Sequence, residues 1–390
     1  MYNIKTLNEI SPVYESMLSA NEYNVSADIE NPDAIIVRSA AMHGMEIPAS
    51  LMAVGRAGAG VNNIPLEDMG KAGVVVFNSP GANANAVKEL AIAALLMASR
   101  DILGSIEWTK TIKGKGADVP KLVEKGKGQF TGPEIMGKTL GVIGLGGVGG
   151  LVANAANSLG MCVLGYDPYL SVQHAWRLSR AIEHAKSEYD LLSRSDYVSV
   201  HTPVTEETRG KYNKALFSQM KPGAVLINFS RGELVVDADM IEALASGQLK
   251  KYVTDFPSDA LIGNPNVIAI PHLGASTPES EDNCVTMVAH QIDSYLKTGS
   301  IINAVNYPDC ELEPCKRHRV AVMHANVPNV VGPVTSLVAS RAINIDSMTN
   351  KSRGQFAYMV LDLDDEPAHD LLDEIAALDT VYRVRVLQSV

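Results

Sequence analysis

The sequence predicts an α/β protein with two doubly wound parallel sheets and a smaller ferredoxin-like domain at its C-terminal end. Short apolar runs alternate with helical patterns from residue 34 to residue 296, which is typical of parallel strands joined by crossover helices. A glycine-rich loop at 144–149 lies between one such run and a helical pattern. From residue 318 the patterns change to the order βαββαβ, which is ferredoxin-like.

Composition limits the possible functions. The 390-residue chain is long enough for two or three domains, and its 46% hydrophobic residues suffice for packed cores. The net charge of −11 argues against nucleic acid and anionic membranes as partners, because both attract basic surfaces. Four cysteines form no disulfide framework, and neither a signal peptide nor a long apolar span is evident, so we expect a soluble protein of the reducing cytoplasm. Cys310 and Cys315 could form a redox pair or bind a metal, but two further ligands are missing nearby, and we interpret both as linker thiols.

Residues 1–98 are expected to form the first domain, with strands at 34–38, 52–57 and 74–78 and a helix at 84–99. Ligands of open α/β sheets bind at the carboxyl ends of strands, so the loops after these strands are candidate binding sites. Arginines there can bind a carboxylate or a phosphate, and a glycine turn can offer backbone N–H groups, although each arginine could be an ordinary surface residue. The candidate substrate-binding residues are Arg38, Ser39, Arg56, Gly58, Ala59 and Gly60.

The glycine-rich loop has the context of a dinucleotide-binding turn. A predicted strand at 139–143 leads into Gly144-x-Gly146-x-x-Gly149, and a helical pattern follows at 151–158. Gly144 permits the tight turn, Gly146 lets the backbone approach a pyrophosphate, and Gly149 lets the helix pack close to the strand. A glycine loop without a ligand is the alternative interpretation.

An acidic residue follows the next predicted strand, 161–166. This residue, Asp167, lies eighteen residues after Gly149, where a carboxylate accepts hydrogen bonds from the adenosine ribose hydroxyls. A 2′-phosphate would meet the negative charge of Asp167, and Pro168 and Tyr169 supply no arginine to offset it. We therefore predict NAD rather than NADP.

Four more strands are predicted at 197–200, 224–228, 253–255 and 267–270, and polar residues recur where they end. The strand ends carry His201-Thr202-Pro203, Ser230-Arg231-Gly232 and Pro271-His272-Leu273-Gly274-Ala275. At these distances after the glycine loop, the segments resemble the D-isomer-specific 2-hydroxyacid dehydrogenases. The segments 56–63, 78–83 and 272–277 are most similar to the members of this family that oxidise 3-phosphoglycerate to 3-phosphohydroxypyruvate, the entry to serine synthesis. The resemblance implies a cofactor domain inserted into a substrate domain, with the helix through 285–296 returning to the N-terminal part.

Oxidation of a secondary alcohol beside a carboxylate needs a cation for the acid, a base for the hydroxyl proton and a hydride acceptor. Histidine titrates near neutral pH and can transfer a proton in either direction, so His272 is the candidate base. Arg231 can hold the carboxylate with two hydrogen bonds and polarise the carbonyl. A loop histidine that caps the following segment is the alternative for His272, whereas we interpret His201 as structural.

The chain departs from the family between Arg231 and His272. The resemblance implies a glutamate that pairs with the histidine, but the shortened acidic stretch 255–260 contains none. Asp259 is the predicted substitute, because the resemblance places Asp255 beside the nicotinamide ribose or carboxamide. If neither aspartate contacts His272, the pH optimum should shift.

The predicted NAD-binding residues lie in the glycine loop or at strand ends: Ser79, Gly144, Gly146, Gly147, Val148, Gly149, Asp167, Thr202, Phe229, Ser230, Asp255, Gly274 and Ala275. A second departure from the family is Lys88, where a small residue is usual. Lys88 could extend the cationic pocket to a substrate phosphate, although a solvated helix lysine is the more common explanation.

The tail from residue 318 resembles an ACT domain, a module that often pairs side by side and binds amino acids at the interface. The resemblance rests on the segments 324–333 and 343–345. Asparagine can donate to a carboxylate and accept from an ammonium group, which suits an amino-acid effector. Asn329 departs from the glycine that is usual in this turn, and the domain could serve only for assembly. The residues at the spacing of serine-binding ACT domains are His324, Asn326 and Asn344.

These interpretations predict a substrate domain at 1–98 completed by 274–304, an NAD-binding domain at 99–273, a linker at 305–317 and an ACT domain at 318–390. The helical stretch 101–136 should cover a neighbour or form a subunit contact. The predicted function is NAD-dependent oxidation of D-3-phosphoglycerate by a homodimer or homotetramer, with serine as a possible effector. A related dehydrogenase of the glyoxylate or hydroxypyruvate reductase type and a non-catalytic NAD-sensing protein are the alternatives.

Overall fold

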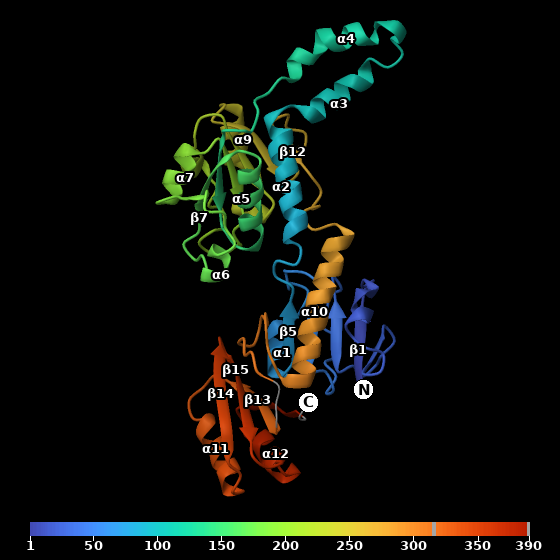
Figure 1. Ribbon diagram of the computed structural model, residues 1–390, viewed down its shortest axis with the longest axis vertical. Helices are drawn as coiled ribbons and strands as arrows, with labels where there is room; N and C mark the ends of the chain where they lie inside the picture. Colours follow the sequence, from blue (N-terminus) through green and yellow to red (C-terminus); the bar gives the residue numbers. More distant parts are fainter. Residues whose placement is uncertain (314–316, 388–390) are drawn as a thin grey trace. The chain divides into compact units, whose positions relative to one another are not determined.

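The computed structural model describes residues 1–313 and 317–387, and the chain divides into two compact units (Figure 1). Unit 1 combines Met1–Asn83 with the chain from Pro278 onward, and unit 2 is Ala84–Thr277. Cys315 lies outside the described residues. Within the described part of the chain, no helix combines the length and the apolar character needed to cross a membrane.

Unit 1 contains a five-stranded parallel sheet with the order β2-β1-β3-β4-β5. Two hydrophobic clusters cover its faces, and α10 (Pro278–Thr298) packs against β3, β4 and β5. The apolar strands β3 to β5 were predicted, but β1 and β2 alternate polar and apolar residues and were not. The strands are β1 Tyr2–Leu7, β2 Tyr23–Ser26, β3 Ala34–Val37, β4 Ala53–Arg56 and β5 Val75–Asn78; α1 spans Leu66–Lys71 and the 3₁₀ helix η1 spans Pro12–Ser16.

Unit 2 contains a seven-stranded parallel sheet with the order β12-β11-β10-β9-β6-β7-β8. The strand order reverses beside β6, which is the doubly wound arrangement predicted from the sequence. The strands are β6 Thr139–Ile143, β7 Cys162–Tyr166, β8 Glu183–His184, β9 Tyr197–Val200, β10 Ala224–Asn228, β11 Leu249–Thr254 and β12 Val267–Ala269. The helices around this sheet are α2 Ala84–Ser99, α5 Gly147–Ser158, α6 Val172–Ala175, α7 Glu188–Arg194, α8 Lys214–Phe217 and α9 Asp237–Ala245, with the 3₁₀ helix η4 at Gly232–Leu234.

Helix α2 belongs to unit 2, although we expected it to end the first domain. Its apolar face, which includes Ala91, Ala94 and Leu95, is buried in the same cluster as Val152 and Ala156 of α5. This packing moves the boundary of unit 2 to residue 84.

The stretch expected to form a subunit contact is an arm of two helices that extends from the sheet of unit 2 (Figure 1). The arm contains α3 (Ile102–Thr111) and α4 (Val119–Gly126), together with the 3₁₀ helices η2 (Gly116–Asp118) and η3 (Lys127–Phe130). Trp108 packs on Phe130 with ring centroids 5.6 Å apart, and Leu103 and Ile106 are exposed.

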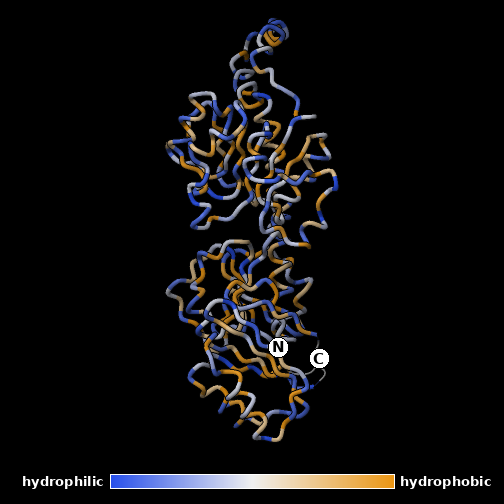
Figure 2. Tube along the Cα trace, turned by 90° about the vertical axis from the view of Figure 1, so that its left-hand side faces the viewer, coloured by the Kyte–Doolittle hydropathy of each residue, from blue (hydrophilic) through white to orange (hydrophobic). Residues whose placement is uncertain are grey.

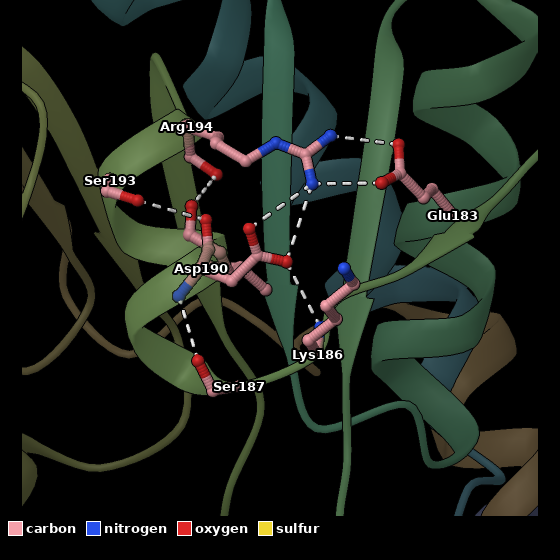
Figure 3. Close-up of polar contacts among 8 residues, drawn as sticks. Glu183, Lys186, Ser187, Asp190, Ser193 and Arg194 are labelled. Carbon is pink, nitrogen blue, oxygen red and sulfur yellow. Dashed lines mark hydrogen bonds and ion pairs between the residues drawn. The ribbon is translucent and has the colours of Figure 1, made fainter.

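The edge strand β8 is fixed by an exposed ion cluster (Figure 3). Arg194 of α7 donates to both carboxylate oxygens of Glu183 at 2.9 Å and approaches Asp190 at 3.4 Å. Ser187 caps the start of α7 by accepting from Asp190 N. The cluster joins β8 to α7.

The C-terminal part of unit 1 has the predicted order βαββαβ. Its antiparallel sheet has the order β14-β15-β13-β16, and α11 and α12 cover one face with a core of Val334, Val338, Leu371 and Ile375. The elements are β13 His318–Ala325, α11 Val331–Ser340, β14 Ile345–Arg353, β15 Phe356–Leu363, α12 His369–Ala376 and β16 Val381–Leu387.

The other face of this sheet shares a core with the five-stranded sheet of unit 1. Phe356 and Tyr358 lie in the same buried cluster as Tyr295 of α10 and Tyr307, and Figure 2 shows apolar segments inside each unit. Tyr307 and Cys310 are fully buried, so the stretch expected as a linker contributes to the core.

Side chains of the antiparallel sheet cap the end of α10. Arg385 donates to the carbonyl oxygens of Tyr295 at 3.5 Å and Leu296 at 3.3 Å. Tyr358 donates to Gly299 O at 2.8 Å, and Arg319 donates to Thr298 O at 2.9 Å. The last carbonyls of a helix lack partners within it, and positive charge there is favourable, so these contacts fix the end of α10.

Candidate functional site

The glycine loop begins where β6 ends and has the backbone that a dinucleotide turn requires. Gly144 has φ +86°, and a Cβ there would lie 2.6 Å from His201 O. A Cβ on Gly149 would lie 1.8 Å from Gly144 O, whereas a Cβ on Gly146 would meet no atom within 4 Å. The loop is therefore tight where the chain turns and open at Gly146, which fits the close approach of a pyrophosphate to the start of α5. Gly147 and Val148 form the first turn of α5.

Asp167 lies at the end of β7 and is bound to the same loop. Its carboxylate accepts from Leu145 N at 2.9 Å and from Tyr169 N at 2.9 Å. Each carboxylate oxygen can accept more than one hydrogen bond, so the group remains able to bind ribose hydroxyls. These residues together fit NAD.

His201 lies beneath the glycine loop rather than at an open surface. Its Nε2 is 2.9 Å from Ser199 Oγ, and its backbone N–H donates to Ile143 O. Burial lowers the pKa of His201 to about 4, which keeps the imidazole neutral. Thr202 contacts the same turn, because a Cβ on Gly144 would lie 3.3 Å from its methyl group.

Arg231 follows β10 in a turn that Asn228 organises. Asn228 is fully buried, donates through Nδ2 to Arg231 O at 2.8 Å and accepts through Oδ1 from Ser230 N at 3.1 Å. Ser230 Oγ donates to Val200 O. The Arg231 side chain is exposed and donates to Ser230 O at 2.7 Å, while Phe229 is buried in the core.

His272 follows β12 in a strained conformation that Asp255 holds. The φ of His272 is +36°, which is uncommon for a residue with a side chain and is often found at functional sites. Its backbone N–H donates to Asp255 O at 2.9 Å, and Gly274 N donates to Asp255 Oδ2 at 3.1 Å. Burial raises the pKa of the Asp255 carboxyl, although the Gly274 hydrogen bond and the charges of His272 and Arg231 oppose this shift. Ala275 is half-buried against the core.

Phe256 lies between the two candidate catalytic side chains. Its ring centroid is 4.7 Å from that of His272 and 6.0 Å from Arg231 Cζ. Phe256 was not predicted as a site residue, because nothing in the sequence spacing indicates that its ring contacts residues 25 positions before and 16 after it. The structure thus brings Arg231 and His272 together around one phenyl ring.

The structure does not bring Asp259 to His272. Asp259 is exposed and makes no hydrogen bond or ion pair with any residue that the structure describes. Asp255 holds the backbone of the histidine loop, and its Oδ1 is buried without a hydrogen-bond partner among the described residues. Asp255 is therefore the acid beside His272 in this structure.

The predicted substrate residues of unit 1 lie after β3 and at or after the end of β4, and Ser79, predicted to bind NAD, follows β5. Arg38 pairs with Glu281 of α10 at 2.7 Å. The guanidinium of Arg56 lies over Gly58, where a Cβ would be 1.4 Å from Arg56 Nη1, and the φ of +144° at Gly58 favours glycine. Ser79 is fully buried, and its hydroxyl accepts from Gly58 N at 2.6 Å, which joins two of the loops. Ser39, Ala59 and Gly60 occupy the same loops.

Gln291 of α10 also contacts these loops and was not predicted from the sequence. It is buried on α10, donates to Asn78 O at 3.1 Å and lines a cavity of about 620 Å³ with Ala82, Met287 and Asn303. Only the pairing of α10 with β5 reveals this contact, since the two residues are 213 positions apart.

Lys88 lies in unit 2, whereas Arg38 and Arg56 belong to unit 1. It lies 3.5 Å from Glu89 and lines a cavity with Ser158 and Leu159 at the end of α5. This position is at the opposite end of α5 from the glycine loop.

The candidate effector residues use their polar groups within the chain. His324 is buried, and its ring nitrogens contact Ala325 O and Asn350 Oδ1 at 2.8 and 2.9 Å. Asn326 donates to Gly354 O, and Asn344 donates to Asp364 Oδ2. These two contacts lie at opposite ends of β15, roughly 25 Å apart at about 3.3 Å per residue, so Asn344 does not join the other two within one chain.

Within the described residues, no group of three or more His, Cys, Asp or Glu side chains could hold a metal ion. Cys162 is an exposed free thiol, whereas Cys284 and Cys310 are buried free thiols. Cys310 packs in the core and forms a β-bridge with Ile301, which gives it a structural place.

Comparisons with known proteins identify the family of the chain and of its C-terminal domain. Residues 92–274 match the family model of the D-isomer specific 2-hydroxyacid dehydrogenase, NAD binding domain, and residues 320–383 match the AHAS small subunit-like ACT domain. The chain is 32% identical to a D-3-phosphoglycerate dehydrogenase of Bacillus subtilis over 77% of this chain and 57% of the relative. It is 31% identical to a putative D-3-phosphoglycerate dehydrogenase of Schizosaccharomyces pombe over 89% of this chain and 76% of the relative.

Among solved structures, the apo D-mandelate dehydrogenase of Rhodotorula graminis has the same fold. It superposes with a TM-score of 0.66 at 24% identity, over 80% of this chain and 99% of that one. Apart from the Schizosaccharomyces relative, the chain spans about half the length of the first curated relatives that it matches.

Proposed function

The chain belongs to the family of D-isomer-specific 2-hydroxyacid dehydrogenases, and from this premise we propose that it oxidises D-3-phosphoglycerate to 3-phosphohydroxypyruvate with NAD⁺, the first step of serine biosynthesis. The observation that carries the proposal is the grouping of Arg231 and His272, which follow β10 and β12, around Phe256, which follows the strand between them, β11. The names of the relatives favour this substrate over other hydroxy acids.

Each of these side chains would perform one task of the reaction. NAD⁺ held at the glycine loop and Asp167 would supply the acceptor for the hydride. Arg231 would bind the substrate carboxylate through two parallel N–H donors. His272 would take the proton of the substrate hydroxyl during oxidation and return it during reduction. Asp255 would hold the histidine loop through the bonds of His272 N and Gly274 N.

The phosphate of the substrate is assigned to Arg38 and Arg56. Arg38 is already paired with Glu281, so a phosphate must compete with that carboxylate. The Gly58 turn, which lies beneath the Arg56 guanidinium, adds backbone donors to the same loop. Lys88 has weaker support as a third cation, because it lies beside Glu89 at the far end of α5.

A spectrophotometric assay tests the proposal. The wild-type protein should form NADH from 3-phosphoglycerate, and His272→Ala should lower kcat by roughly 10² to 10⁴-fold, the usual contribution of a general base. Equal rates in the two proteins would remove His272 from the reaction. No turnover in either protein, combined with tight NAD⁺ binding, would support the NAD-sensing alternative.

A substrate panel separates the candidate dehydrogenases. D-glycerate, glyoxylate and hydroxypyruvate lack the phosphate, so kcat/KM should be highest for 3-phosphoglycerate and 3-phosphohydroxypyruvate if the cations of unit 1 bind that group. A preference for glyoxylate or hydroxypyruvate would instead favour a reductase of that type.

Assembly and regulation complete the proposed function. We assign a homodimer or homotetramer to the chain, supported by the exposed apolar residues of the arm and by the ACT domain. We assign serine as the effector of His324, Asn326 and Asn344; because Asn344 lies at the other end of the sheet, the site would need two chains. Light scattering measures the first assignment, and calorimetry with serine measures the second.

A further inference from the structure

The reaction needs an imidazole that is held in one orientation, and the segment 255–260 lacks the glutamate that the family resemblance implies. Asp255 fixes the backbone of the His272 loop, but no carboxylate among the described residues hydrogen-bonds to the His272 ring. The ring contact that the structure does give to His272 comes from Phe256.

The geometry of this contact is specific. The two rings are 4.7 Å apart between centroids and tilted by 47°, which lies within the range of favourable aromatic pairs. The Arg231 guanidinium carbon lies 6.0 Å from the same phenyl centroid, at the limit of a cation–π contact. One ring therefore contacts both candidate catalytic side chains, which are themselves exposed.

We propose that Phe256 is a positioning residue that holds the His272 imidazole and the Arg231 guanidinium toward one common substrate, the task that the family resemblance assigns to a glutamate. The proposal rests on the dehydrogenase function proposed above. It gives the departure from the family a physical explanation: an apolar ring restricts the imidazole by packing, where the family uses a hydrogen bond.

The chain fixes Phe256 from three directions. Its backbone N–H donates to the buried Thr254 Oγ1 at 3.1 Å, and Pro257 restricts the backbone conformation of Phe256. A Cβ added to Gly232 would lie 3.2 Å from Phe256 Cβ, so the glycine after Arg231 leaves room for the phenyl group. The ring is thus held by its own strand end and by the turn that carries Arg231.

The test compares Phe256→Leu, Phe256→Tyr and a matched control, Ile262→Ala, in the full-length protein. Leucine keeps an apolar side chain without the ring, tyrosine keeps the ring, and Ile262 is 62% exposed in the loop that follows. Phe256→Leu should lower kcat for 3-phosphoglycerate at least tenfold and raise KM several-fold, because small misplacements of catalytic groups are costly. Phe256→Tyr should stay within about twofold of wild type, as should Ile262→Ala, and NAD⁺ affinity should be unchanged in all three.

A second measurement does not depend on turnover. Diethyl pyrocarbonate modifies exposed imidazoles, and mass spectrometry of the peptide with His272 gives its rate of modification. The rate should rise several-fold in Phe256→Leu, because the ring no longer covers one face of the imidazole. If wild type oxidises no acid of the panel but this rate still rises, the proposed function fails and the positioning stands.

Other results would overturn the positioning. These are Phe256→Leu within twofold of wild type, Phe256→Tyr no better than Phe256→Leu, or a lower kcat in Phe256→Leu with no change in the rate of His272 modification. A loss of NAD⁺ affinity that parallels the loss of kcat would also overturn it, because it would show a general disturbance of unit 2.

Discussion

The glycine loop at the start of α5 is open to a ligand, whereas the candidate effector residues at the ACT end of unit 1 already make hydrogen bonds within the chain. In the loop, Gly146 opens to free space, and no side chain caps the first turn of α5 in the described structure. At the ACT end, His324, Asn326 and Asn344 all bond within the chain. Donors that face open space are ready for a ligand, whereas donors that are already bonded must first be released. The comparison predicts that NAD⁺ binds to its loop without rearrangement, whereas a ligand of the three ACT residues would first have to replace their hydrogen bonds within the chain.

The strongest test of this contrast is the pair Gly149→Ala and Gly150→Ala. A Cβ on Gly149 would lie 1.8 Å from Gly144 O, but a Cβ on Gly150 would have its nearest neighbour at 3.4 Å. We expect Gly149→Ala to weaken NAD⁺ binding on the order of 100-fold, or about 2.7 kcal/mol. Gly150→Ala should bind NAD⁺ as wild type does, since alanine is favoured over glycine inside a helix. Titration by protein fluorescence measures both affinities, and equal losses would show that the loop tolerates a side chain at its tightest point.

The next test concerns His201, which lies beneath the glycine loop. The folded His201, whose pKa burial lowers to about 4, stays neutral while the unfolded imidazole takes up a proton below about pH 6.5. This difference is absent above pH 6.5 and reduces stability as the pH falls toward 4. Between pH 7 and pH 5 the loss should be about 2 kcal/mol.

His201→Asn removes the titrating group and provides the comparison for that loss. We measure the free energy of unfolding in urea, using hydrogen exchange of the β9 peptide as the probe. This free energy should change less between pH 7 and pH 5 in His201→Asn than in wild type. The carboxylates of the protein titrate in both proteins, so the difference isolates His201. An equal change in both would mean that the imidazole is protonated in the folded state.

The site residues that could be predicted from the sequence are those that act through their own backbone or through residues close to them in the chain. Gly144, Gly149 and Asp167 act through their own backbone or through the adjacent loop, so their pattern indicated their places. The strands β3 to β5 were predicted from continuous apolar runs, but β1 and β2 mix polar and apolar residues and become strands only by pairing.

The residues that were missed act across the sheet. Phe256, Asn228 and Glu281 have ordinary sequence surroundings, and only the packing of strand ends or of α10 brings them to Arg231, His272 and Arg38. The same limit explains Asp259. Asp259 was predicted as the partner of His272 because the resemblance placed Asp255 at the nicotinamide, but the structure leaves Asp259 exposed, and Asp255 lies beside the histidine instead.

The smallest expected effect concerns the ACT end of unit 1, where polar side chains of the antiparallel sheet contact the end of α10. Arg385 is buried, donates to Tyr295 O and Leu296 O, and lies 4.4 Å over the Tyr295 ring. Arg385→Met keeps the length of the side chain but removes both hydrogen bonds and the cation–π contact, so the end of α10 should lose about 1 to 2 kcal/mol of local stability. Hydrogen exchange of the peptide 290–299 measures this loss, and the matched control is Arg341→Met, because the partners of Arg341, Asp370 and Glu374, lie on α12. If both variants exchange like wild type, the antiparallel sheet does not support α10, and the polar groups of the ACT end would be free to reorganise around an effector.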